Sequence, residues 1–114
     1  MAEYMVVAVD FDGVIHDFKH PVEGRRMCPP IAVARQALEK LRELGFQIVV
    51  FTVWGNDKGI RTIEDYMIFY QLPFDEVTNV KPNADYYIDD KAIKFIDWNS
   101  TLQGIEEGSN NVGL

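Results

Sequence analysis

Two carboxylates separated by a single residue stand at the end of an apolar run near the start of the sequence. Met5 to Val9 is apolar throughout, and Asp10, Asp12 and Gly13 follow it directly. Residues two apart near a strand end point to the same side, so the two anions come close together. That arrangement is unfavourable unless a cation or a shared proton relieves the repulsion. The pattern therefore predicts a polar site, where Gly13 permits a sharp turn and the close approach of a ligand.

Other residues able to do chemistry also stand beside apolar segments. Thr52 follows one apolar run, Asp89 and Asp90 follow another, and Lys81 lies in a loop between them. Oxygen ligands without clustered cysteine or histidine favour magnesium over zinc. A hydroxyl and an ammonium group are suited instead to hold an anion. Taken singly, each of these residues has an ordinary role as a turn cap or a solvated charge, so their ordered positions are what indicate a site.

A metal beside an anion pocket is the equipment for phosphoryl transfer. In this interpretation Asp10 attacks phosphorus and forms an aspartyl-phosphate, which divides one difficult displacement into two easier steps. Asp12 donates a proton to the leaving alcohol and later accepts one from water. Lys81 neutralises the phosphoryl oxygens. Asp89 binds the metal directly, and Asp90 binds it through water or orients its neighbours.

The ordered set resembles the motifs of the haloacid dehalogenase superfamily of phosphohydrolases. Asp-Phe-Asp-Gly-Val at 10–14 is similar to the first motif, and Phe51-Thr52 is similar to the second. Lys81-Pro82 is similar to the third motif, and residues 87–92 are similar to the fourth in its double-aspartate form. The resemblance extends over about residues 5–98, which is nearly the whole chain.

The resemblance implies a magnesium ion, an aspartyl-phosphate intermediate and a Rossmann-like sheet. It implies that Asp10 and Asp89 ligate the metal by their side chains and Asp12 by its carbonyl oxygen. An aspartate at position 12, rather than alanine or serine, implies phosphatase and not dehalogenase chemistry.

The alternation of apolar runs with helical patterns predicts the elements that must position these groups. Strands are expected at 5–9, 46–51, 74–78, 84–88 and 92–98. Strand–helix–strand order is typical of a parallel sheet with right-handed crossovers, whose strand ends form a binding crevice along one edge. We expect a three-layer, Rossmann-like α/β fold with a central parallel sheet of about five strands and no cap domain. A single domain over 1–114 is expected, with a frayed tail at 108–114.

Apolar residues at helical spacing predict the intervening helices. The first is expected to begin at Pro29-Pro30 and to end before Gly45, a plausible C′ residue. The second is expected to be capped by Asn56 or Asp57 and to run to about Gln71. A final helix is expected to begin at 99 or 100 and to reach about 107.

Composition limits the partners. The formal net charge is −7, so a basic face for nucleic acid or an anionic membrane is not expected. The single cysteine, Cys28, excludes an internal disulfide and is expected to be a packing residue in its Met-Cys-Pro-Pro turn. The first apolar run is too short for a signal segment or a membrane span, so a cytoplasmic location is expected.

The segment 16–29 has no helical or alternating period and is expected to be a flap loop beside the site. His16 and His20 are expected to be ordinary loop residues rather than a metal pair, and Arg25 and Arg26 are candidates to meet an anionic substrate. Without a cap, the site suits a large phosphorylated partner or a small one enclosed by a neighbouring subunit of a homo-oligomer. We favour a small substrate, such as a sugar phosphate.

Several alternatives share the same residues. The covalent intermediate can pass its phosphoryl group to an alcohol, which would make the chain a phosphotransferase, and a macromolecule-directed phosphatase also fits an open site. A signalling receiver domain uses similar groups, but there the lysine comes last, whereas Lys81 here precedes Asp89 and Asp90. A binding protein that has lost turnover is the remaining alternative.

Overall fold

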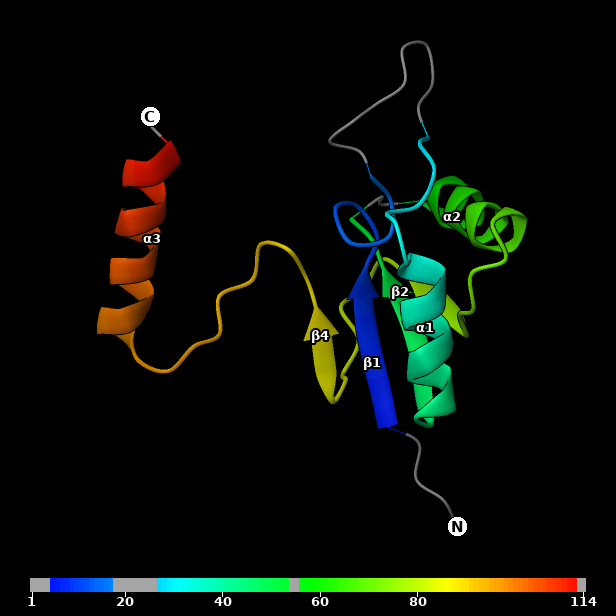
Figure 1. Ribbon diagram of the computed structural model, residues 1–114, viewed down its shortest axis with the longest axis horizontal. Helices are drawn as coiled ribbons and strands as arrows, with labels where there is room; N and C mark the ends of the chain where they lie inside the picture. The colour runs from blue at the N-terminus through cyan, green and yellow to red at the C-terminus, as the bar shows by residue number, and fades with distance from the viewer. Residues whose placement is uncertain (1–4, 18–26, 54–55, 113–114) are drawn as a thin grey trace.

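A computed structural model describes residues 5–17, 27–53 and 56–112 of the chain, with side chains up to 108. Four strands and three helices lie in these residues (Figure 1). In chain order they are β1 (Met5–Asp10), α1 (Ala34–Glu43), β2 (Phe46–Phe51), α2 (Asp57–Phe69), β3 (Glu76–Thr78), β4 (Tyr86–Ile88) and α3 (Trp98–Val112).

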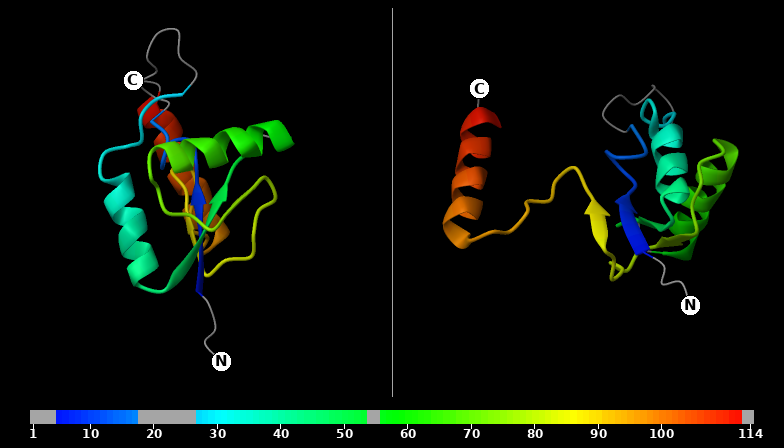
Figure 2. Two further views of the ribbon diagram at one scale, coloured as in Figure 1. Left: turned by 90° about the vertical axis from the view of Figure 1, so that its right-hand side faces the viewer. Right: turned by 60° about the horizontal axis from the view of Figure 1, so that its bottom comes forward.

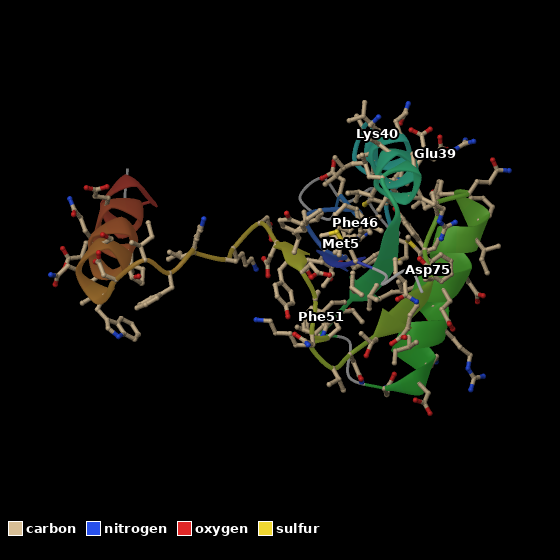
Figure 3. The ribbon with its side chains drawn as sticks, turned by 90° about the horizontal axis from the view of Figure 1, so that it is seen from below. Met5, Glu39, Lys40, Phe46, Phe51 and Asp75 are labelled. Atoms are coloured by element: carbon tan, nitrogen blue, oxygen red, sulfur yellow. The ribbon has the colours of Figure 1, made fainter. Side chains whose placement is uncertain are left out.

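The strands form an open parallel sheet in the order β3-β2-β1-β4, which confirms the α/β class. The central strands β1 and β2 pair along their full length, from Met5 with Phe46 to Asp10 with Phe51. On the other side of β1, β4 pairs over three residues and ends with Ile88 beside Val9. The carboxyl ends of β1 and β4 therefore meet at the same edge of the sheet. Figure 3 views the molecule from below and labels residues of β1 and β2 side by side.

One face of the sheet carries the main core. Val7 and Val9 of β1 and Ile48 and Val50 of β2 are almost completely buried there. These positions alternate along their strands, so their side chains point to the same face. Leu38 of α1 and Ile63, Tyr66 and Met67 of α2 belong to the same cluster. Both helices therefore contribute to this core, with α1 packing on β2 and α2 on β3 (Figure 2).

Two aspartates fasten the edge strands at the opposite end of the sheet. Asp75 precedes β3, and its carboxylate accepts a hydrogen bond from the Ile48 backbone N–H at 2.7 Å. Asp85 precedes β4 in the same way and accepts from the Val6 N–H at 2.7 Å. Each aspartate also donates its own N–H to the carbonyl of the same partner residue. The short strands β3 and β4 are therefore held in register at their starts.

Several element boundaries differ from those predicted. The expected fifth strand at 92–98 is wrong, because residues 92–97 contain no strand and α3 begins at Trp98. The Asp97 carboxylate caps this helix by accepting from the Ser100 N–H at 2.7 Å. The tail expected to fray from 108 is helical up to Val112. The first helix begins at Ala34 rather than at Pro29-Pro30.

Helix α3 stands apart from the sheet, beyond the extended segment that follows β4 (Figures 1 and 2). In the described part of the chain it packs on no other helix or strand, so the body has two layers where three were expected. Its apolar stripe of Trp98, Leu102 and Ile105 is exposed. Among the described residues, no helix has the length and apolarity needed to cross a bilayer.

Candidate active site

Three carboxylates converge where β1 and β4 end. Oxygen atoms of Asp10, Asp89 and Asp90 all lie within 4.8 Å of one another. Asp10 is the last residue of β1, and Asp89 and Asp90 directly follow β4, which pairs with β1. Residues far apart in the sequence therefore meet because their strands are parallel neighbours. The structure brings these three predicted residues together.

The electrostatics of Asp10 reflect this crowding. Partial burial, followed by the repulsion of Asp89, raises the pKa of Asp10 from 3.8 to about 6. Asp90 and Asp12 add smaller repulsions, and the Phe11 backbone N–H, which donates to the Asp10 carboxylate at 3.0 Å, opposes the rise in pKa. A cation bound nearby would therefore stabilise the ionised form of Asp10 more than it stabilises that of an ordinary surface aspartate.

Gly13 allows Asp90 to reach the cluster. Its φ of +87° belongs to the region that favours glycine. A Cβ built on Gly13 would overlap the carboxylate of Asp90, coming 2.9 Å from its Cγ. The sequence predicts that Gly13 permits the close approach of a ligand, whereas the group that lies close to it in the structure is the Asp90 side chain of the same chain.

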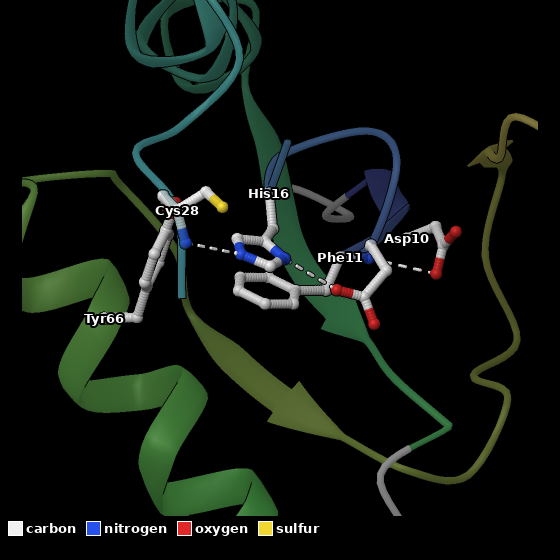
Figure 4. Close-up of polar contacts among 6 residues, drawn as sticks. Asp10, Phe11, His16, Cys28 and Tyr66 are labelled. Carbon is white, nitrogen blue, oxygen red and sulfur yellow. Dashed lines mark hydrogen bonds and ion pairs between the residues drawn. The ribbon is translucent and has the colours of Figure 1, made fainter. Parts of the chain in front are cut away.

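Asp12 faces a different set of partners. Its Oδ1 lies 2.8 Å from Nδ1 of His16, whose Nε2 accepts a hydrogen bond from the Cys28 backbone N–H at 2.8 Å. The Tyr66 hydroxyl donates to the Cys28 carbonyl at 2.6 Å (Figure 4). Burial raises the pKa of this Tyr66 hydroxyl. The Asp12 side chain is 30% exposed and is not part of the three-carboxylate group.

The two residues predicted to bind an anion lie at different depths. Lys81 lines a hollow of about 600 Å³ together with Asp10 and Asp89, and its Nζ lies 4.9 Å from the centre of the Tyr87 ring. Thr52 directly follows β2 at the same edge of the sheet and is buried, with its N–H donating to the Thr78 carbonyl at 3.0 Å. The lysine therefore shares a surface with the carboxylates, and the threonine lies at the end of the adjacent strand.

Sequence reasoning missed the buried polar residues behind Asp12. His16 was expected to be an ordinary loop residue, yet it is 2% exposed and bonded at both ring nitrogens. The four-residue spacing from Asp12 to His16 was a usable signal once a turn after Gly13 was expected. Cys28 is buried, as expected of a packing residue. The predictions for His20, Arg25 and Arg26 lie outside the described residues.

The donor set fits a hard divalent cation. Among the described residues, the groups that gather are carboxylates alone, and oxygen-only ligands with several negative charges suit magnesium or calcium. Burial, followed by the repulsion of Asp89, raises the pKa of Asp10, and a cation bound beside these carboxylates would offset that repulsion.

The fold and this rim define an open parallel α/β protein with an acidic site at the carboxyl edge of its sheet. No protein-family profile matches the sequence, and no curated protein matches it. Among solved structures, a conserved protein from Bacteroides thetaiotaomicron is similar, with a TM-score of 0.58, 24% identity and 93% of each chain covered. A protein from Vibrio cholerae is similar with a TM-score of 0.54 and 24% identity, covering 91% of this chain and 98% of its own. At this identity the likeness shows the fold.

Proposed function

We propose that this chain is a magnesium-dependent phosphatase that hydrolyses a phosphate monoester through an aspartyl-phosphate on Asp10. The observation that carries the proposal is the convergence of Asp10, Asp89 and Asp90 within 4.8 Å at one rim, next to a hollow that Lys81 also lines. Metal-ligating carboxylates beside a cation suited to a phosphoryl group are the components that this chemistry needs.

The reaction proceeds in two displacements. A carboxylate oxygen of Asp10 attacks phosphorus, the ester P–O bond breaks, and Asp12 gives its proton to the departing alkoxide. Asp12 then takes a proton from water, the water oxygen attacks phosphorus, and the bond to Asp10 breaks. Inorganic phosphate leaves, and both aspartates return to their starting states.

The remaining residues would bind the metal ion and the phosphoryl group. Asp10 and Asp89 would ligate Mg²⁺ by their side chains and Asp12 by its carbonyl oxygen, with Asp90 acting through water or as an orienting group. Bound there, Mg²⁺ supplies positive charge that offsets the charge developing on the phosphoryl oxygens. Lys81 and Thr52 would bind the other phosphoryl oxygens.

The openness of the site guides the choice of substrate. The hollow beside Asp10 is about 600 Å³ and borders exposed residues, which leaves room for a small phosphorylated metabolite such as a sugar phosphate. A neighbouring subunit in a homo-oligomer would close this space. Transfer of the phosphoryl group to an alcohol uses the same intermediate, so phosphotransfer is tested beside hydrolysis.

The first test is hydrolysis of 4-nitrophenyl phosphate with and without Mg²⁺. The wild type is expected to need the metal, and Asp10→Asn is expected to lose activity by at least about 1000-fold because the nucleophile is gone. Asp65→Asn is a matched control, since Asp65 is exposed on α2. Full activity in Asp10→Asn would refute the assignment of the nucleophile.

The second test is a crystal structure with vanadate or beryllium fluoride and Mg²⁺. We expect the phosphoryl mimic between Asp10, Thr52 and Lys81. A mimic bound elsewhere would contradict the assigned pocket. A panel of phosphorylated metabolites, assayed with and without an added alcohol, then separates hydrolysis from transfer.

A further inference from the structure

His16 is a buried histidine enclosed by aromatic rings directly behind the predicted acid–base residue. Its ring stacks on Phe11, with centroids 5.3 Å apart and planes 6° from parallel. The Tyr66 ring packs perpendicular to it, with centroids 5.7 Å apart and planes at 87°. Only 2% of His16 is exposed, so the orientation of its ring is set by packing.

The hydrogen bonds identify which ring nitrogen carries the proton. Nε2 lies 2.8 Å from the Cys28 backbone nitrogen, which can only donate, so Nε2 must present its lone pair. The ring hydrogen is therefore on Nδ1, and it points at Oδ1 of Asp12 at 2.8 Å. The imidazole is a directional donor to the aspartate.

Backbone contacts also fix the place of this donor. The His16 N–H donates to the Phe11 carbonyl at 2.9 Å, and the His16 carbonyl accepts from the Gly13 N–H at 2.9 Å. Cys28, which sets the tautomer, is itself held by the Tyr66 hydroxyl at 2.6 Å. Helix α2, the 27–29 segment and the turn after β1 are thus joined through one imidazole (Figure 4).

We propose that His16 is a positioning residue that sets the direction in which Asp12 gives and takes its proton. The inference rests on the proposed function, in which Asp12 is the general acid and base. With Oδ1 accepting from His16, the proton of the neutral acid is carried on Oδ2. The hydrogen bond from His16 to Oδ1 thereby makes Oδ2 the oxygen that exchanges a proton with the leaving group. The packing of Phe11 and Tyr66 against the His16 ring holds the ring in the orientation that makes this hydrogen bond.

A purely structural role for His16 makes a different prediction. If the ring only fills space and joins two segments, its replacement affects all substrates alike, because the whole site is perturbed. If it positions Asp12, its replacement affects substrates in proportion to their need for a proton. Alkoxide leaving groups need protonation in the transition state, and nitrophenolate scarcely does.

Two substitutions separate the two hydrogen bonds of the ring. In His16→Asn the amide nitrogen lies near the place of Nδ1 and can still donate to Asp12, while the bond to Cys28 is lost. In His16→Gln the longer amide reaches the place of Nε2 and can accept from Cys28, while the donor to Asp12 is lost. Both variants remove the aromatic ring, so they are matched for the loss of stacking.

The decisive measurement is kcat/KM with Mg²⁺ for 2-phenylethyl phosphate and 4-nitrophenyl phosphate. His16→Gln is expected to lose about 10- to 100-fold on the alkyl ester and less than about 3-fold on the aryl ester. His16→Asn is expected to remain within about 5-fold of the wild type on both. Equal losses on the two esters, or a greater loss in His16→Asn, would overturn the proposal. Thermal unfolding of both variants checks that they fold.

A second readout is independent of turnover. Long-range ¹H–¹⁵N NMR spectra of the intact chain are expected to show His16 protonated at Nδ1 and unprotonated at Nε2. The opposite tautomer would overturn the proposal whatever the kinetics show. If the wild type hydrolyses neither ester, the proposed function fails and this inference falls with it. Activity on both esters with no selective loss in His16→Gln defeats the His16 proposal alone.

Discussion

Replacing Gly13 by alanine should damage the acidic site in a way that its backbone strain does not explain. Gly13 has φ +87°, and a Cβ there would overlap the Asp90 carboxylate. Gly45 offers a matched control, because its φ is +93° and nothing lies within 4 Å of an added Cβ. The two substitutions therefore share the strain of a positive φ and differ in the group that the new methyl meets.

The expected magnitudes follow from these two features. A positive φ for alanine costs about 1–2 kcal/mol, so Gly13→Ala and Gly45→Ala should each lower the free energy of unfolding by that amount. Asp90 is exposed, and its carboxylate can turn away from the methyl at little further cost in stability. The displaced carboxylate then leaves Asp10 and Asp89. We expect the Kd for Mg²⁺ to rise about tenfold in Gly13→Ala alone, as is typical when a supporting ligand is lost.

The assay combines urea unfolding with calorimetric titration of Mg²⁺ for four proteins: both alanine variants, Asp90→Ala, and the double variant Gly13→Ala with Asp90→Ala. Removing the Asp90 carboxylate abolishes the overlap, so Gly13→Ala should weaken Mg²⁺ binding no further in that background. Wild-type affinity in Gly13→Ala would refute the reasoning. An equal loss of Mg²⁺ affinity in Gly45→Ala would also refute it. A loss of Mg²⁺ affinity in Gly13→Ala that adds fully to the loss in Asp90→Ala would refute it as well.

Without Mg²⁺, the pKa of Asp10 in the folded protein lies above its unfolded value of 3.8, so folding favours the protonated acid. The stability that protonated Asp10 contributes is present below about pH 4 and is lost as pH rises through about 6. Urea unfolding of the wild type and of Asp10→Asn from pH 4 to 7 will measure this loss. A wild type that becomes more stable relative to Asp10→Asn as pH rises would contradict this sign. Ile63→Ala, at a fully buried position, should lower the free energy of unfolding by about 2–5 kcal/mol, while Ile68→Ala on the exposed side of the same helix should change it by less than about 0.5 kcal/mol. Trp98 is 68% exposed, so in a Trp54→Phe background its fluorescence should be red-shifted and readily quenched by acrylamide; blue-shifted, protected emission would mean that α3 packs on a partner surface.

The central part of the fold was predictable because its signals are local and strong. The apolar runs that became β1 and β2 are long enough to be recognised alone, and Gly45 ends the first helix with the positive φ that a C′ residue requires. The short edge strand β4 and the segment that follows it have weaker local signals, because their structure depends on tertiary contacts. Only three residues of β4 pair with β1, and the apolar residues after Asp90 resemble a strand although they pair with no strand in the described part of the chain.

The candidate site was predictable to the extent that it lies at strand ends. Asp10, Asp89 and Asp90 meet because β1 and β4 are adjacent and parallel, which the order of elements implies. The burial of His16 was not predictable from composition, because it depends on Cys28 and Tyr66, which follow 12 and 50 residues later in the chain. A histidine in an irregular segment shows its importance only when the groups on both ring nitrogens are known.

The polarity of a parallel sheet explains why aspartates next to its strands have opposite fates. Asp75 and Asp85 precede strands, where the neighbouring strand still offers unpaired backbone N–H groups, and each carboxylate binds one of them at 2.7 Å. Asp10 and Asp89 come at strand ends, where each carboxylate accepts a backbone N–H from a residue close behind it in the chain but also lies against other carboxylates. The same residue type therefore fixes register at the amino ends of the strands and concentrates negative charge at their carboxyl ends. A bound cation would offset the charge at the carboxyl ends, so substitutions of Asp75 or Asp85 should lower the stability of the fold and substitutions of Asp10 or Asp89 should weaken cation binding.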